Sequence, residues 1–149
     1  MSKILALDIA THCGWATETA SGVWDFTLKR GESYGIRVVR FKAKVRELID
    51  LESVEIISYE RVAGIHKAAI IVASEMVGVL HDLCIEKGVL ITAYSASEIK
   101  KFATGKGNAN KAAMVQAAKE KYGYLGTSDD EADAIHLYHL TNTDLNSNK

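Results

Sequence analysis

The order in which two kinds of hydrophobic pattern follow one another constrains this chain more than any other feature. Short apolar or alternating runs come first and predict three strands, at residues 4–9, 14–19 and 23–28. Helical periodicity then alternates with two further apolar runs, at residues 54–59 and 89–94. An antiparallel meander followed by helix–strand alternation predicts an α/β fold, with a mixed five-stranded sheet flanked by helices.

The helical segments are bounded by recognisable start and stop signals. Ser95 and Glu98 form a capping-box pattern, and Thr127 or Ser128 is placed to cap the last helix. A turn is expected at Ser21–Gly22, between the second and third strands. Helices are predicted at residues 37–51, 66–87, 95–103, 110–122 and 128–139, followed by a polar, frayed tail at 141–149.

Length and composition favour one ordinary globular domain over residues 1–149. The formal net charge of -1 means that any contact with nucleic acid must come from local basic patches. Cys13 and Cys84 are too few for a disulfide framework and are expected to be buried. No secretion signal or membrane-length apolar run stands out, so we expect no membrane partner. The pattern favours the cytosol of a bacterium or of a phage-infected host, and leaves an organelle open.

Four acidic residues stand at the ends or on the faces of the predicted elements. Asp8 follows the first apolar run, Glu60 closes the fourth, and Asp130 and Asp133 lie three apart on the last helix. Carboxylates brought together from two strands and one helix repel one another unless cations bind them. Hard divalent cations such as Mg²⁺ prefer such oxygen ligands. The pattern therefore predicts a metal-dependent phosphoryl-transfer enzyme.

Each of these residues taken alone has a simpler structural explanation. Asp8 could form a turn at a strand end, and Asp130 could be an acid favoured by the positive end of the helix dipole. An isolated lysine such as Lys111 is most often solvated. The neighbouring acids Asp129 and Glu131 also leave the register of the helical pair open. Only the occurrence of all four acids together favours a metal site over these simpler explanations.

Four motifs occur in a fixed order along almost the whole chain. They are Asp8 with a following Gly14, Glu60 at the end of the fourth strand, the loop G-x-G-x-A-x-K over residues 105–111, and D-x-x-D-A over residues 130–134. In this order they resemble the RuvC family of Holliday junction resolvases, which belongs to the ribonuclease H-like superfamily. The short chain suggests a phage-type or organelle-type member.

The resemblance implies an endodeoxyribonuclease that cuts branched DNA, such as Holliday junctions or forks. It implies two Mg²⁺ ions per active site, for which Mn²⁺ can substitute. Asp8 would bridge the metals, with Glu60 on one and Asp133 on the other. Asp130 would complete a metal shell or orient the attacking water. Lys111 would contact the scissile phosphate and offset negative charge in the transition state.

Basic residues are concentrated on both sides of this acidic set. Such residues could bind a DNA backbone next to the metals, although charged runs are usually solvated surfaces. The candidates for DNA binding are Lys100, Lys101, Lys106 and Lys111 around the glycine-rich loop, Arg61 after the fourth strand, and Arg37, Arg40 and Lys44 on the first helix.

The helix predicted over residues 66–87 is apolar nearly all round. One stripe must pack on the sheet, and the remaining apolar positions need another cover. In a chain of this size we expect a second copy to supply it, which predicts a homodimer. Two active sites could then cut a two-fold symmetric branched DNA.

One departure from the family pattern concerns substrate choice. RuvC proteins commonly carry a base-stacking aromatic residue three positions after the strand-end Glu, and here that position is Ala63. Its loss predicts that forks or flaps are cut as well as four-way junctions. Three other functions remain open: an actin-like ATPase or sugar kinase, a non-catalytic DNA-binding module, and a ribonuclease H acting on RNA–DNA hybrids. His136 lies one turn after Asp133 and is expected to be partly exposed.

Overall fold

A five-stranded mixed sheet is built around β1, four of whose five residues are buried. The computed structural model describes residues 3–147 of the chain. The sheet order is β3-β2-β1-β4-β5, in which β1–β2 and β2–β3 pair antiparallel and β1–β4 and β4–β5 pair parallel. The strands are β1 (Ile4–Asp8), β2 (His12–Ala16), β3 (Ser21–Asp25), β4 (Ile56–Glu60) and β5 (Leu90–Tyr94).

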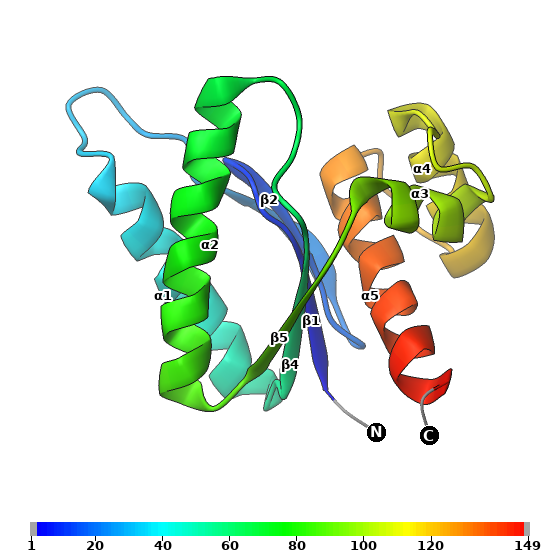
Figure 1. Cartoon of the computed structure of the whole chain (residues 1–149), viewed down its shortest axis with the longest axis horizontal. Coiled ribbons are helices and arrows are strands. Elements are labelled where there is room, and N and C mark those ends of the chain that lie inside the picture. The colour runs from blue at the N-terminus through cyan, green and yellow to red at the C-terminus, as the bar shows by residue number, and fades with distance from the viewer. Residues whose placement is uncertain (1–2, 148–149) are drawn as a thin grey trace.

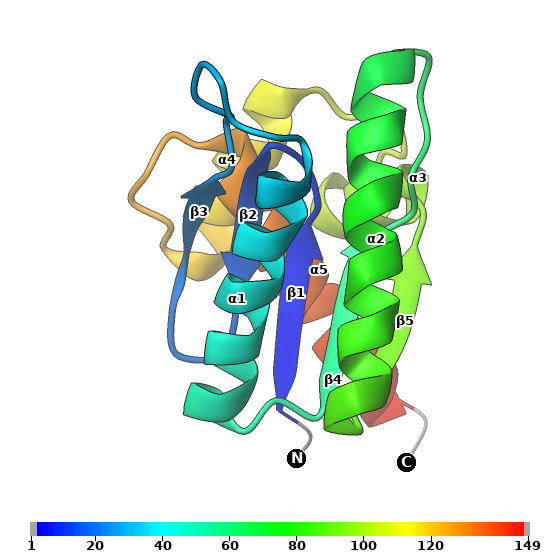
Figure 2. The ribbon, with the colours of Figure 1, turned by 90° about the vertical axis from the view of Figure 1, so that its left-hand side faces the viewer.

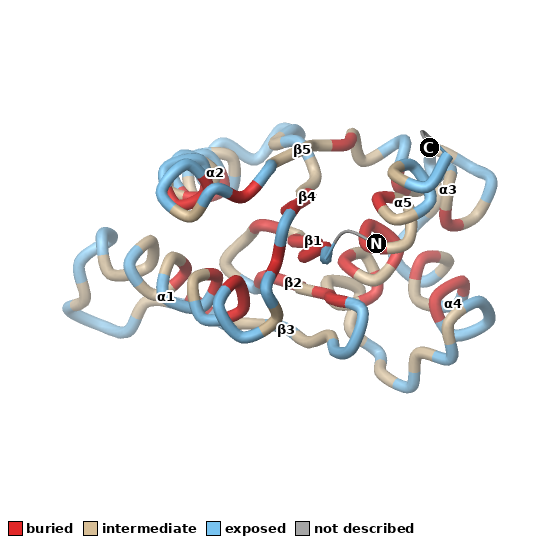
Figure 3. Tube along the Cα trace, turned by 90° about the horizontal axis from the view of Figure 1, so that it is seen from below, coloured by how far each residue is buried: buried red, intermediate tan, exposed pale blue. Residues whose placement is uncertain are grey.

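Helices cover both faces of this sheet and make a three-layered molecule (Figure 1; Figure 3). Two helices lie side by side on one face (Figure 2). A third crosses the opposite face, and two shorter helices lie on its side away from the sheet. The first pair is α1 (Gly35–Glu52) and α2 (Lys67–Lys87), and the second group is α5 (Asp129–Ser147) with α3 (Ala96–Thr104) and α4 (Lys111–Tyr122). This is the mixed five-stranded sheet flanked by helices that the sequence predicts.

The alternation of side chains along β1 divides the core into two halves. Leu5 and Leu7 point toward α1 and α2, where they join a cluster that includes Phe41 and Leu80. Ile4 and Ala6 face α5 and join a second cluster around Leu137. The central strand is therefore buried on both faces, as its continuous apolar run predicts. Both cysteines are buried and unpaired, as expected.

The start signals of the helices act as predicted. Ser95 and Glu98 form the complete capping box of α3, and Asn110 caps α4 by accepting a hydrogen bond from the amide of Ala113. Of the two candidates for α5, Ser128 is the residue that caps, since its hydroxyl accepts a hydrogen bond from the amide of Glu131. These caps fix where the last three helices begin, and so where their first turns lie.

The turn between β2 and β3 differs from the prediction. It occupies residues 17–20 and not Ser21–Gly22, which both lie within β3. The hydroxyl oxygen of Thr17 accepts hydrogen bonds from the amides of Thr19 and Ala20 and so closes the turn with a side chain. A threonine turn carries no glycine signal, which is why both strands were expected about two residues too late.

The predicted frayed tail is wrong over the described residues, because α5 continues to Ser147. Thr141 is fully buried, and its hydroxyl hydrogen bonds with the hydroxyl of Ser58 on β4 at 2.7 Å. The hydroxyl of Tyr94 on β5 donates to Asp144 at 2.8 Å. These polar contacts with the sheet stabilise the last turns of the helix, where its apolar periodicity is weaker. The last two positions of the predicted tail, 148–149, lie outside the described residues.

Helix α2 is long and apolar enough to span a membrane by length and composition alone, contrary to our expectation from the sequence. A single such helix is weak evidence for a membrane. Met76, Leu80 and Leu83 pack it on the sheet, yet Ile71 and Ile85 are 48% and 86% exposed. The helix thus has one face in the core and apolar side chains left on the other.

The Ser58–Thr141 contact provides a test of how the end of α5 is held. Thr141→Val keeps the side-chain volume but leaves the buried Ser58 hydroxyl without that partner, so the free energy of unfolding should fall by about 1–2 kcal/mol. Thr143→Val, at an exposed position of the same helix, should change it by less than about 0.5 kcal/mol. Urea unfolding measures both, and an equal effect of the two variants would contradict this account of the helix end.

Candidate active site

Two carboxylates come from adjacent parallel strands and therefore meet at one edge of the sheet. Leu7 on β1 pairs with Tyr59 on β4, so Asp8 and Glu60, one residue further along each strand, lie at neighbouring carboxyl ends. Both side chains are partly exposed at this edge. The order of the strands alone thus places the two acids together.

The other two carboxylates come from the first two turns of α5. Gly14 on β2 makes their approach possible, because a Cβ at this position would lie 1.9 Å from the backbone oxygen of Asp130. Its strand partner in β1 is Asp8. Since only a residue without a side chain fits there, the N-terminal end of α5 rests directly on the strand next to Asp8. Asp130 and Asp133, nearly one turn apart, face the same way.

The electrostatics of the four acids show that they share one site. Burial raises the pKa of Asp8 well above its usual value, and the charges of Asp133, Glu60 and Asp130 raise it further. The charges of all three other acids therefore act on Asp8.

Burial raises the pKa of both Asp133 and Glu60. Burial, followed by the charges of Glu60, Asp129 and Asp130, raises the pKa of Asp133 to about 7. Burial raises the pKa of Glu60 as well, and the charge of Lys100 opposes the rise at both residues. The ammonium of Lys100, on α3, consequently lies close enough to the acids to offset part of their repulsion. From the sequence, Lys100 was predicted only to bind DNA near the glycine-rich loop.

The set of four acids has the chemistry of a site for a hard divalent cation. All of its potential ligand atoms are carboxylate oxygens, and their raised pKa values report negative charge that a cation would stabilise. Within residues 3–147, no three His, Cys, Asp or Glu side chains are already arranged as a ligand shell. The residues therefore fit Mg²⁺ in type, and a cation would offset their mutual repulsion.

A groove of about 180 Å³ opens beside Asp8 and Glu60. The loop between β4 and α2 and the first turns of α2 form its other side, with Arg61 and Ala63 among the residues that line it. Arg61 lies 3.4 Å from Glu98, and both side chains are more than half exposed. A phosphate backbone in this groove would run past the acids.

The basic residues predicted to bind DNA fall into two groups. Lys101, Lys106 and Lys111 are exposed. Burial and the charge of Asp129 raise the pKa of Asp130, and the charge of Lys111 opposes this rise. Lys111 also lies 3.8 Å from Asp129. His12, to which the sequence gave no role, acts on Asp130 in the same direction. Lys111 and His12 therefore lie close to the acids of α5.

The first-helix group lies on the other face of the sheet. The guanidinium of Arg40 is paired with Glu32, and the Nε of Arg37 donates to the carbonyl oxygen of Phe26 at 3.4 Å. Lys44 is exposed halfway along α1. The structure therefore does not bring these three residues to the acids.

His136 is fully buried, although its position predicted partial exposure. Its Nε2 lies 2.8 Å from the carbonyl oxygen of Met114 on α4, and its ring packs against Tyr122. Burial lowers the pKa of the imidazole. The residue thus belongs to the α4–α5 packing and not to the acidic site.

The raised pKa of Asp133 predicts how the metal-free protein responds to pH. Because the folded-state pKa lies above the unfolded value of 3.8, the carboxyl binds a proton more tightly when folded. Its contribution to stability is full below pH 4 and is lost as the pH rises toward about 7. In EDTA, Asp133→Asn should be more stable than the wild type. Its advantage in free energy of unfolding should grow by on the order of 2 kcal/mol from pH 5 to pH 8. Denaturant unfolding at the two pH values measures the difference, and a gain that is independent of pH would contradict the assignment.

Comparisons with known proteins identify the family and the fold. The family model described as Crossover junction endodeoxyribonuclease RuvC matches residues 22–137, a span that includes Glu60, Asp130 and Asp133 but not Asp8. No curated protein sequence matches the chain.

Solved structures with the same fold include two of RuvC from Thermus thermophilus. The one in complex with a Holliday junction substrate has a TM-score of 0.78 at 18% identity and covers 98% of this chain and 97% of its own. The other has a TM-score of 0.75 at 19% identity, with 97% and 96% covered. The yeast mitochondrial Holliday junction resolvase Ydc2 has a TM-score of 0.65 at 13% identity, with 92% and 76% covered. At these identities the likeness shows the fold.

Proposed function

Because the chain belongs to the RuvC family of crossover junction endodeoxyribonucleases, we propose that it cuts branched DNA by metal-dependent hydrolysis of phosphodiester bonds. The observation that carries this proposal is the convergence of four carboxylates, in which Asp8 is acted on by Glu60, Asp130 and Asp133 together. A site of this kind costs free energy in the absence of a cation. The fold keeps the acids together in spite of that cost.

Asp8, Glu60, Asp130 and Asp133 would hold two Mg²⁺ ions, or Mn²⁺ in their place. When bound, these ions supply Lewis-acid stabilisation of the attacking and leaving oxygens. Asp8 would be a ligand of these ions, a role supported by the effect that each of the other three acids has on its pKa. In the metal-free protein, burial and the charges of Glu60, Asp129 and Asp130 raise the pKa of Asp133 to about 7, and a bound cation would stabilise its ionised form.

Lysine side chains would complete the site by contacting phosphate. Lys100 offsets the charge of Glu60 and Asp133, and Lys111 stands at the first position of α4, next to Asp129. The amide groups at that helix end and the Lys111 ammonium could meet the same phosphate oxygen. Lys101, Lys106 and Arg61 would hold the backbone further along.

The loop between β4 and α2 supports a broad choice of branched substrate. Ala63 is exposed there and offers no ring for base stacking, and Ile65 is 90% exposed. An aliphatic side chain can enter an opened base step without the sequence preference that specific hydrogen bonds give. We therefore include forks and flaps with four-way junctions among the substrates.

The metal-site assignment predicts the behaviour of Asp8→Asn. The amide keeps the shape and removes a ligand charge, so nicking should fall by at least about 100-fold while DNA binding is retained or tightened. End-labelled four-way junction, fork and linear duplex, each with Mg²⁺, Mn²⁺ or EDTA, measure this loss. Asp129→Asn, a neighbouring acid outside the predicted ligand set, should stay within about tenfold of the wild type. Full activity of Asp8→Asn would disprove the assignment.

The two loop lysines should separate binding from turnover. Lys106→Ala should weaken binding to all branched substrates alike and reduce the salt slope of log K by about one. Lys111→Ala should slow cleavage at saturating DNA by about 10- to 100-fold, because it removes charge next to the reacting phosphate. Filter binding and single-turnover cleavage provide the two readouts. If Lys111→Ala changes affinity alone, its transition-state role is wrong.

The exposed side of α2 supports a homodimer. Beside the polar side chains of Lys42, Ser74, Glu75 and Asp82, a groove of about 530 Å³ between α1 and α2 carries the apolar side chains of Val38, Val39 and Val79, and Ile71 extends the apolar surface along the helix. A second copy docked there would remove these side chains from water. A two-fold symmetric pair would present two acidic sites to one branched DNA.

Val79→Asp should convert the proposed dimer to a monomer, because it places a charge in the groove. Leu51→Asp is the matched control, since Leu51 is 74% exposed at the far end of α1. Sedimentation at micromolar concentration should give twice the chain mass for the wild type and for Leu51→Asp. A wild type that sediments as a monomer would exclude this interface.

A further inference from the structure

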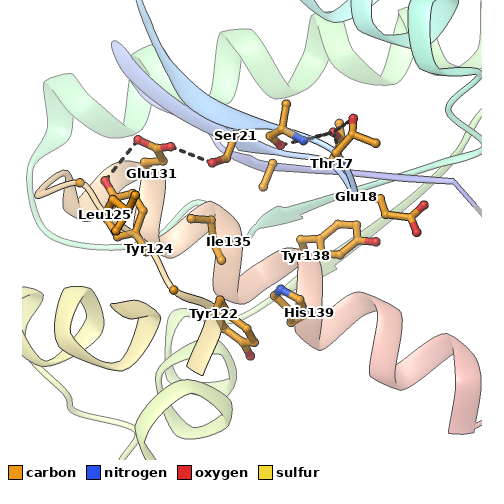
Figure 4. A pocket seen from close by; sticks show the side chains of 15 residues that line it. Thr17, Glu18, Ser21, Tyr122, Tyr124, Leu125, Glu131, Ile135, Tyr138 and His139 are labelled. Carbon is orange, nitrogen blue, oxygen red and sulfur yellow. Dashed lines mark hydrogen bonds between the residues drawn. The ribbon is translucent and has the colours of Figure 1, made fainter. Parts of the chain in front are cut away.

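A second cavity, of about 470 Å³, lies on the outer side of α5 and has no part in the proposed nuclease chemistry. It is open to solvent and is bordered by the β2–β3 turn, by the segment between α4 and α5, and by one face of α5 (Figure 4). Asp130 and Asp133 belong to the site at the edge of the sheet, whereas Glu131, Ile135 and His139 line this cavity. Its volume is typical of a site for a small ligand or a single large side chain.

The chemistry of its walls is unusual for a DNA-binding protein. Three of the six tyrosines of the chain line the cavity, together with Glu18 and Glu131, and none of its lining residues is Lys or Arg. Two acids without a balancing cation would repel a phosphate backbone. The cavity is therefore not a continuation of the DNA-binding surface.

The aromatic wall is ordered by contacts with its neighbours. Tyr122 stacks on His139 with a centroid distance of 3.7 Å and an interplanar angle of 5°. Tyr138, next along α5, packs edge-on against the His139 ring. Burial and the nearby His136 lower the pKa of His139, so this ring is neutral at neutral pH and adds no repulsion toward a cation.

The two carboxylates stand at opposite ends of the cavity, with Ile135 between them (Figure 4). Glu131 accepts hydrogen bonds from the hydroxyls of Ser21 at 2.7 Å and Tyr124 at 3.2 Å, which fix its orientation and leave it further acceptor capacity. Glu18 is exposed and, within residues 3–147, forms no ion pair. Glu131 is thus held in position by hydrogen bonds, and the exposed Glu18 is available to a ligand.

We propose that this cavity binds an organic cation, a guanidinium or alkylammonium group carried on an aliphatic chain. Aromatic faces attract such cations, Ile135 suits the aliphatic chain, and the two glutamates supply the opposite charge. Two sources present this chemistry: an arginine or lysine side chain of a partner protein, and a free polyamine. The site is separate from the acidic site at the sheet edge, although both use α5.

Binding is tested with the full chain carrying Asp8→Asn, so that the result does not depend on nuclease activity. The probes are an acetylated Leu-Arg-Leu amide, the same peptide with citrulline in place of arginine, and spermidine. NMR follows the ring resonances of Tyr122, Tyr138 and His139 during each titration. The arginine peptide should shift them saturably, and the citrulline peptide, which lacks the charge, should bind at least about fivefold more weakly.

Two substitutions locate the contact. Glu18→Gln removes a charge from an exposed side chain and should weaken arginine-peptide binding about three- to tenfold without altering the fold. Glu47→Gln, an equally exposed acid on α1 across the sheet, should leave it unchanged. Saturable shifts with spermidine as well would identify a site for organic cations of either source. Shifts with the arginine peptide alone would identify a protein side chain as the ligand. No saturable shift with either probe, equal binding of the citrulline peptide, or equal effects of the two substitutions would overturn the proposal.

Discussion

The close contact between α5 and β2 is the constraint on which the acidic site depends. Gly14 leaves room for the backbone of Asp130, and Ala132 and Ala134, both fully buried, keep the same helix close to the sheet. Without this approach the carboxylates of α5 would stand too far from Asp8 to raise its pKa. A small residue on a strand and small residues on a helix therefore decide where the charges meet, and the charges decide what the site can bind.

Four carboxylates held close together repel one another, and several neighbouring groups reduce this repulsion. Lys100 offsets the charge of Glu60 and Asp133, and His12 and Lys111 offset the charge of Asp130. None of these contacts neutralises the set fully, and the remaining charge is what a divalent cation would stabilise. The same arrangement explains why basic residues around an acidic site are useful to an enzyme whose substrate is a polyanion.

Much of the fold could be predicted from local patterns, because each strand and helix carries its own periodicity and most caps are local. The convergence of Asp8 with Glu60 also follows from the order of the strands. The β2–β3 turn could not be predicted, since a threonine hydroxyl closes it and no glycine marks it. The end of α5 was missed because its stabilising partners, Ser58 and Tyr94, are distant in the sequence. The role of Lys100 beside the acids and the aromatic cavity behind α5 likewise arise only from tertiary contacts.

The most direct test of the account is the position of bound metal. Crystals grown with Mn²⁺ and an uncleavable four-way junction would locate the ions by their anomalous scattering. The account predicts manganese bound to the carboxylates of Asp8, Glu60 and Asp133, with Asp8 shared between two ions. Manganese that binds elsewhere on the protein, with none in contact with Asp8, would contradict it.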